Sequence, residues 1–277
     1  MAKIEVLCAT MNQKDFSKVK EMNIKTNVLF ANQAGENRYS KIEQDGICAR
    51  MITTDTVGVG INRNIALMNS DSDICLFSDD DIKYVDNYAQ IIESAFSELP
   101  DADALIFNIE TIGEDHGRRI NAKIKKLSYH NCLNYGAARI AVKSDVIKNK
   151  NIYFHRNFGG GTEFSSGEDS LFIWDMIKKG MKVYAYPAKI GSVDQTTSTW
   201  FKGYNKKYIF DKGALFFCMS KSLYRLFCLY ILFKHKYMYK GDNMTFFEAY
   251  KLMMIGAKSF KKGISHSQYL NITNSSK

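Results

Sequence analysis

The sequence predicts an α/β fold in which helices cover both faces of a doubly wound, mostly parallel β-sheet. Three observations carry this prediction. Short apolar runs alternate with helical segments over the first 110 residues, a cluster of carboxylates follows one of these runs, and a basic, aromatic segment replaces the alternation in the last quarter of the chain. With 277 residues and 45% apolar composition, the chain is long enough for one large domain and a small appendage.

The elements of the first part follow from apolar periodicity and from turn residues. We expect strands at residues 4–9, 28–31, 48–52, 74–78 and 104–109, and helices at 14–22, 61–68 and 86–98. Residues 110–165 are less regular and contain a glycine-rich run at 157–162, which is typical of a lid or binding loop. A helix that begins near Leu171 and ends near Gly180, and a strand at 182–186, complete the pattern.

Three consecutive aspartates, Asp79, Asp80 and Asp81, follow the apolar run 74–78 at the expected exposed end of a buried strand. Because like charges repel, such a cluster is favoured when a cation shares it or when water solvates it. Open α/β sheets bind ligands at this end of their strands. The cluster therefore indicates either a Mg²⁺ or Mn²⁺ site that holds a diphosphate, or a solvated acidic turn before the next helix.

Cysteine usage bears on compartment and on metal binding. The six cysteines are scattered, without the short paired spacing of a zinc site, which is typical of a reduced, cytoplasmic protein. Residues 1–9 lack the basic segment and the long apolar core of a signal peptide.

The net charge of +9 is unevenly distributed along the chain. Residues 1–201 carry 24 Lys and Arg against 26 Asp and Glu, whereas residues 202–277 carry 14 against 3. A basic segment of this kind favours nucleic acid, an acidic protein or an anionic membrane as partner. The sequence has no recognisable nucleic-acid-binding motif, so we expect no nucleic acid.

Residues 214–233 form an apolar stretch that decides between these partners. The stretch is nearly long enough to span a bilayer, but Lys221 and Arg225 lie near its centre, where each costs about 2.5 to 3.5 kcal/mol. On a single helix the two cations share one face, which favours a helix lying in the membrane interface. The alternative is a helix packed on the main domain. The flanking lysines favour an anionic membrane surface.

The motifs together, in their order, resemble a known family. An apolar strand ending in Asp79-Asp80-Asp81, preceded by residues 60–67 and followed about 90 residues later by Gly167-Glu168-Asp169, resembles the family 2 inverting glycosyltransferases, which have the GT-A fold. The resemblance covers residues 1–200 and implies a nucleotide-sugar-binding and catalytic domain there. Residues 201–277 resemble the basic helical segment of members that work peripherally on the inner face of bacterial membranes.

The resemblance also implies a reaction. The chain would move a hexosyl or N-acetylhexosaminyl group, with inversion and with Mn²⁺ or Mg²⁺, from a UDP-sugar or another nucleotide-sugar donor. The acceptor would be a glycan or a lipid-linked saccharide in the synthesis of capsule, O-antigen or exopolysaccharide.

Site roles follow for individual residues. The resemblance implies that Asp79 and Asp81 hold the metal, with Asp79 also near the ribose and Asp80 beside the nucleotide. Arg63 would lie by the nucleotide, although many arginines are simply solvated. Further nucleotide contacts are implied for the polar residues at the ends of the first two strands, which can also be ordinary turn formers: Thr10, Asn12 and Asn32.

The acidic pair Glu168 and Asp169 carries the catalytic assignment. Inverting transfer needs a base that takes the proton of the acceptor hydroxyl, and the resemblance implies Asp169 for this role, with Glu168 holding the acceptor. The alternative is structural, because Ser166 with an acid three residues later forms a capping box.

The third metal ligand departs from the family pattern. Many relatives have a histidine after the last strand, where this chain has Asp194; His155 is the other nearby option. Two competing functions remain, a Mg²⁺-dependent phosphohydrolase and a non-catalytic membrane-docking scaffold. The first needs a small hydroxyl residue where Ile82 and Lys83 stand, and the second predicts damaged acid motifs, whereas both are intact.

Overall fold

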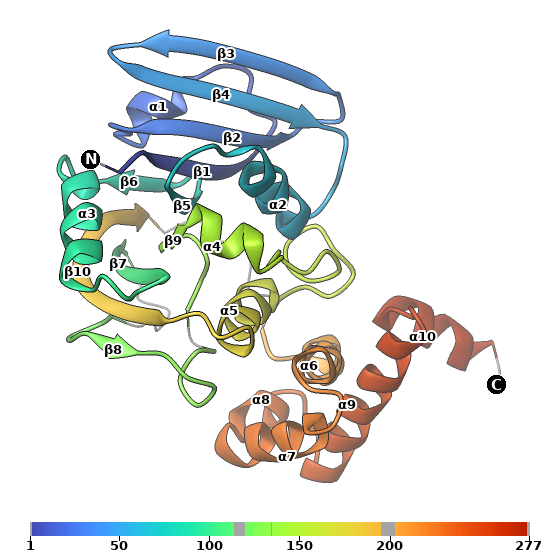
Figure 1. The fold of residues 1–277 in the computed structure, drawn as a ribbon. Coiled ribbons are helices and arrows are strands. Elements are labelled where there is room, and N and C mark those ends of the chain that lie inside the picture. Colours follow the sequence, from blue (N-terminus) through green and yellow to red (C-terminus); the bar gives the residue numbers. More distant parts are fainter. Residues whose placement is uncertain (1, 114–119, 134, 195–202, 276–277) are drawn as a thin grey trace. The chain divides into compact units, whose positions relative to one another are not determined.

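The computed structural model describes residues 2–113, 120–133, 135–194 and 203–275. The chain divides into two compact units (Figure 1). The first unit comprises Met1–Arg156 and Glu168–Thr197, and the second, the helical unit, comprises Asn157–Gly167 and Ser198–Lys277. The helical unit thus takes a short segment from the middle of the sequence. The boundary expected at residue 200 lies outside the described residues.

The described strands of the first unit form one sheet in the order β3-β4-β2-β1-β5-β9-β7-β10-β6, with β8 paired to β10. Neighbours β4, β2, β1 and β5 are parallel, as are β7 and β10, and the other pairs are antiparallel. The sheet is therefore mixed: the parallel ladders hold most of the paired residues, and antiparallel strands join or flank them. The strands are β1 Ile4–Met11, β2 Asn27–Gln33, β3 Arg38–Gln44, β4 Ile47–Thr54, β5 Ile74–Asp79, β6 Ile82–Tyr84, β7 Ala104–Ile112, β8 Lys125–Lys126, β9 Ile140–Lys143 and β10 Val183–Asp194.

Helices cover both faces of this sheet, as predicted. Side chains alternate between the faces of a strand, so Val6 packs in one core with Tyr88 of α3, while Phe77 meets the ring of Phe172 on α5 on the other face, at 5.4 Å between centroids. The helices of the first unit are α1 Lys18–Glu21, α2 Val59–Asn69, α3 Tyr88–Glu98, α4 Ser144–Asn149 and α5 Glu168–Lys178. Only four residues of the first expected helix, 14–22, are helical.

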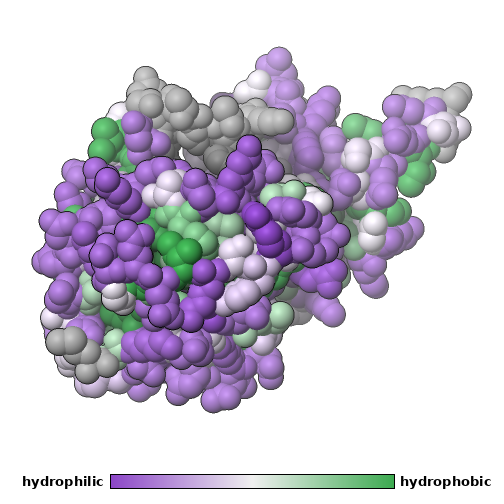
Figure 2. Space-filling view, turned by 90° about the horizontal axis from the view of Figure 1, so that it is seen from above, coloured by the Kyte–Doolittle hydropathy of each residue, from purple (hydrophilic) through white to green (hydrophobic). Residues whose placement is uncertain are grey.

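Two strands differ from their predictions for local reasons. Strand β10 continues well past Pro187, because a register shift between Ala185 and Lys189 accommodates the missing amide hydrogen. Strand β3 was not predicted; it pairs with β4 through a two-residue turn at Asp45 and Gly46, both at positive φ. Most residues of β3 are exposed and polar, as expected for a protected edge strand, and the surface seen in Figure 2 is mostly hydrophilic with an apolar patch near its centre.

The helical unit is built on a close crossing of two helices. A Cβ on Gly213 of α6 would lie 1.9 Å from the Met253 carbonyl oxygen, and one on Gly256 of α9 would lie 2.0 Å from that of Phe210. Only glycine permits this approach of the two backbones. The helices are α6 Lys206–Met219, α7 Tyr224–Lys234, α8 Tyr237–Lys240, α9 Phe246–Lys261 and α10 His266–Asn274.

The expected single helix at 214–233 is wrong. Helix α6 ends before Ser220, whose backbone is extended and whose Oγ accepts a hydrogen bond from the Leu223 amide at 3.2 Å. Lys221 lies in this turn and Arg225 on α7, so the two cations do not share one helix. Helix α6 is largely buried and packs against α9 within the helical unit, whereas α7 buries few side chains. Within the described part of the chain, no helix has the length and apolarity needed to cross a membrane.

The glycine-rich segment 157–167 is anchored within the helical unit. The rings of Phe158 and Phe164 pack against Phe260 of α9, with centroids 5.4 and 5.0 Å apart. Asp211 of α6 accepts hydrogen bonds from the backbone amide and the hydroxyl of Ser165. The segment is therefore a packed part of this unit.

Candidate active site

The predicted polar residues gather at one edge of the sheet. Register pairs Thr10 with Asn32 and Ala9 with Asp79, so β1, β2 and β5 end together. Strands β5 and β7 are both antiparallel to β9, and β10 is parallel to β7, so β10 ends at the same edge, at Asp194. Parallel register thus explains why residues far apart in the sequence meet here.

The three aspartates have different surroundings. Asp79 accepts a hydrogen bond from Nη2 of Arg63 at 2.8 Å, and Asp80 accepts one from the Thr10 hydroxyl. Asp81 precedes Ile82, which pairs with Val193, so Asp81 and Asp194 are the next residues along this antiparallel pair. Each carboxylate therefore has a different neighbour: an arginine for Asp79, a hydroxyl for Asp80 and strand β10 for Asp81.

Arg63 of α2 connects the two acidic motifs. Its Nη1 donates to Asp169 at 2.9 Å and to Glu168 at 3.2 Å, while Nη2 holds Asp79. The side chain is 4% exposed, and its guanidinium lies 5.3 Å from the ring centroid of Phe154. Burial alone lowers the pKa of Arg63, but the three carboxylates more than reverse this effect, so the net pKa is raised. The sequence predicted that this arginine lies by the nucleotide. In the structure its buried side chain is paired with the three carboxylates.

The position of Arg63 depends on contacts that sequence reasoning did not assign to the site. Asn64 brackets the backbone of Phe154, donating to its carbonyl at 2.9 Å and accepting from its amide at 2.8 Å. Phe154 in turn stacks on Phe172 of α5, with centroids 3.8 Å apart. A Cβ on Gly60 would lie 2.8 Å from the His155 carbonyl oxygen. The sequence signal for these contacts was the glycine and the asparagines at 60–64, which stand out in an otherwise apolar helix.

Glu168 and Asp169 form the first turn of α5, where the helix dipole favours negative charge. Burial raises the pKa of Asp169, and the charges of Glu168 and Asp79 raise it further against the opposing effect of Arg63. Gly136 lies close by, since a Cβ there would be 3.6 Å from Oδ2 of Asp169. A carboxylate with a raised pKa, held by a buried cation, is suited to accept a proton.

The strand-end amides have distinct positions. Asn32 is fully buried: its Oδ1 accepts from the Gln13 amide at 2.9 Å, and its Nδ2 donates to the Gln13 carbonyl and to Thr53. Asn32 therefore holds the loop after β1. Asn12 is exposed in this loop at a φ of 54°. Asn62 of α2 reaches the same edge, where its amide donates to the carbonyls of Thr10 and Ala31.

Metal binding can be tested against these residues. In the described ranges, no group of three or more His, Cys, Asp or Glu side chains is arranged to hold a metal ion. Asp81 and Asp194 directly adjoin the last paired residues of β6 and β10, Ile82 and Val193, and Mg²⁺ is commonly held by one or two carboxylates together with substrate phosphates. The residues therefore fit a metal that the substrate helps to bind. His155, the other option, is partly buried, and burial lowers its pKa.

Comparison with solved structures identifies the fold. No protein-family model matches the sequence, and no curated protein matches it. A crystal structure of S. aureus TarS 1–349 in complex with UDP-GlcNAc matches with a TM-score of 0.61 at 11% identity, covering 95% of this chain and 93% of that one. The complex with UDP matches with a TM-score of 0.57 at 12% identity and the same coverage. The chain spans 44% of a longer TarS structure, with a TM-score of 0.58 at 13% identity over 87% of this chain. The first unit thus has a mixed α/β fold of the GT-A type.

Proposed function

We propose that the protein is an inverting glycosyltransferase that takes a sugar from a nucleotide-sugar donor. One observation carries the proposal: the aspartates at the end of β5 and the acidic pair at the start of α5 meet at a single buried arginine, Arg63. In this proposal the first motif binds the charged donor and the second accepts a proton. The likeness to structures that contain UDP and UDP-GlcNAc supports a uridine nucleotide as the donor.

Asp169 serves as the general base in this proposal. The acceptor hydroxyl attacks the anomeric carbon while its proton passes to Asp169, and the bond between the sugar and the nucleoside diphosphate breaks. A raised pKa makes Asp169 a stronger base than an ordinary carboxylate. Arg63 orients the carboxylate through its 2.9 Å hydrogen bond, and Glu168 lies beside it to hold the acceptor.

The donor diphosphate needs neutralisation near the carboxylates. Asp81 and Asp194 would hold Mn²⁺ or Mg²⁺, and the metal would stabilise the negative charge of the departing diphosphate. Asp79, which Arg63 already holds, would line the same site toward the ribose. Thr10 positions Asp80 through its hydroxyl.

The acceptor and the setting are the broader part of the proposal. We assign the acceptor to a glycan or lipid-linked saccharide of a bacterial surface polysaccharide, with the enzyme peripheral on the inner membrane face. The basic charge of residues 202–277 and the exposed apolar side chains of α7 support membrane attachment. A UDP-linked hexose or N-acetylhexosamine is the donor to test first.

The metal requirement provides the direct test. Calorimetry should show that UDP binds in Mn²⁺ and that this binding is lost in EDTA. Turnover of UDP-sugars should depend on Mn²⁺ in the same way. Asp81→Asn should weaken metal-dependent UDP binding by about tenfold or more, since it replaces a charged ligand by a neutral one. Asp71→Asn, at an exposed carboxylate paired with Lys3, is the matched control. UDP binding that is equal with Mn²⁺, with EDTA and in Asp81→Asn would remove the metal from the mechanism.

A further inference from the structure

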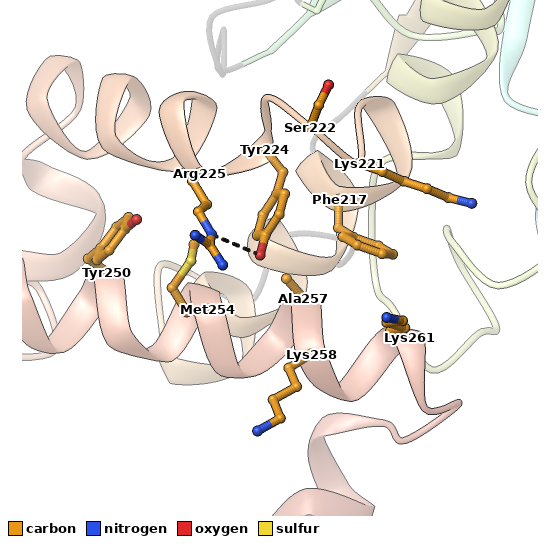
Figure 3. Close-up of a pocket in the computed structure, with 10 residues that line it drawn as sticks. All are labelled: Phe217, Lys221, Ser222, Tyr224, Arg225, Tyr250, Met254, Ala257, Lys258 and Lys261. Atoms are coloured by element: carbon orange, nitrogen blue, oxygen red, sulfur yellow. Dashed lines mark hydrogen bonds between the residues drawn. The ribbon is translucent and has the colours of Figure 1, made fainter.

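A basic cavity lies in the helical unit between α6, α7 and α9 (Figure 3). Its volume is about 740 Å³, within the range of small-molecule sites. Four cationic side chains line it, Lys221, Arg225, Lys258 and Lys261, together with aromatic rings from all three helices. All of the lining residues belong to this unit, and none of them is a residue of the carboxylate site.

The charge of this cavity is not neutralised by the protein. The lining contains neither Asp nor Glu, and within the described residues none of its four cations makes an ion pair. Arg225 donates from Nε to the Tyr224 hydroxyl at 3.2 Å (Figure 3), and the described part of the chain provides no hydrogen bond to its two terminal nitrogens. An anion that enters here meets the Arg225 guanidinium without competing against a carboxylate; the ammonium groups of Lys221 and Lys258 point away from Arg225 (Figure 3) and add positive charge around it.

The start of α7 adds a second, independent preference for anions. Tyr224 and Arg225 are the first residues of this helix, and Ser222 lies in the turn before it; all three line the cavity. The amino end of a helix carries partial positive charge that favours an anion, although the amides of Leu223 and Tyr224 already donate to Ser220.

We propose that this cavity binds the phosphate group of an anionic ligand, which is either a lipid headgroup or a soluble phosphate compound. The planar guanidinium of Arg225 matches two phosphate oxygens, while the lysines contribute point charges. The rings of Phe217 and Tyr250 form the less polar walls beside it. This proposal rests on the helical unit alone and is independent of the glycosyl-transfer chemistry.

Two charge-matched double variants of the full chain separate the cavity from general basicity. R225Q/K258Q removes two charges from the cavity, and K251Q/K262Q removes two exposed charges from outside its lining. The probes are inorganic pyrophosphate, followed by calorimetry, and phosphatidylglycerol vesicles compared with phosphatidylcholine vesicles, followed by sedimentation. The cavity variant should lose about tenfold or more in affinity, and the control much less. The affinity of Arg225→Lys, which keeps the charge but not the planar guanidinium, should lie between those of the wild-type chain and the cavity variant.

The two probes distinguish the sources of the phosphate. Pyrophosphate binding that depends on Arg225 supports a soluble ligand, and binding only to phosphatidylglycerol vesicles supports a lipid headgroup. Equal losses in the two double variants, or no binding to either probe by the wild-type chain, would overturn the proposal. Melting temperatures establish that each variant is folded; the substituted side chains are exposed, so little change is expected.

Discussion

One buried arginine sets the electrostatics of the candidate active site. Arg63 faces three carboxylates, Asp79, Glu168 and Asp169, with one positive charge, so the group retains an excess of negative charge. This excess has two consequences. Together with burial, which is the larger cause, it raises the pKa of Asp169, and it favours a further cation among the neighbouring aspartates.

The residue on which catalysis depends most directly is Asp169. Asp169→Asn keeps the size and the acceptor oxygen for Arg63 but cannot take a proton, so sugar transfer should fall by about 10²-fold or more. Because the folded state raises the pKa of Asp169, its ionisation opposes folding increasingly as the pH rises above the ordinary value of 3.8. The asparagine variant should therefore melt no lower than wild type at pH 7, whereas a residue that only capped α5 would cost about 1 kcal/mol. Near-normal turnover in a folded variant that binds UDP would end this assignment.

The pH profile tests the coupling within the acidic pair. Transfer should rise with pH as Asp169 ionises, with the acid limb above pH 3.8 because the pKa is raised. Glu168→Gln removes a negative charge that raises this pKa, so the acid limb should move to lower pH. Asp175→Asn, further along α5, removes a charge that is not among the main causes of the shift and should leave the limb in place. An unmoved limb in both variants would show that another group controls the profile.

Among the elements, helix α7 is unusual because it is apolar on nearly all sides yet buries only Cys228 and Leu232. Leu226, Tyr230 and Phe233 are 60, 60 and 66% exposed. At 11 residues, about 16 Å, the helix is too short to cross a bilayer. An apolar helix among basic residues is suited to lie in a membrane interface.

Polar replacements on α7 test this attachment. The triple variant L226S/Y230S/F233S should weaken binding to phosphatidylglycerol vesicles by about 10²-fold or more, since each side chain contributes about 1 kcal/mol or more when it leaves water. The triple variant Y39S/V57S/M68S, at positions of similar exposure in the first unit, should bind as wild type does. Equal binding by both variants would contradict the role of α7. Sedimentation of the free proteins shows whether the α7 surface instead joins two copies of the chain.

At the scale of the whole molecule, the two units are not consecutive in the sequence. Residues 157–167 separate the two parts of the first unit but belong to the helical unit. Their phenylalanines, Phe158 and Phe164, are buried and pack against the partly buried Phe260 of α9. A cut near the expected boundary at residue 200 therefore divides a packed cluster.

Truncation tests this organisation. A chain lacking residues 203–277 should aggregate, because Phe158 and Phe164 lose the helices against which they pack. In the full chain, Phe260→Ala should lower the free energy of unfolding of the helical unit. Replacing a fully buried phenylalanine by alanine typically costs about 3–5 kcal/mol, and the loss here should be smaller because Phe260 is only partly buried. Light scattering and thermal unfolding measure these effects. A monomeric truncated protein that melts as the full chain does would show that the segment needs no support.

Much of the site was predictable because its signals are local. The apolar run before Asp79 predicts a buried strand, and strands of this kind place their ends at one edge of the sheet. The order of the acidic motifs predicted the GT-A fold, which the likeness to TarS supports. Even the unpredicted strand β3 had a local signal, the Asp45-Gly46 turn.

What the sequence determined by itself was the alternation of elements, the acidic edge and the uneven charge, because these depend on neighbours along the chain. Only the tertiary structure decided that Arg63 lies between two acidic motifs about 90 residues apart in the sequence, and that Gly213 and Gly256 form one helix crossing. In sequence, such residues look like a surface arginine and weak helix formers. Their roles arise from packing between distant segments, for which a single sequence carries no local signal.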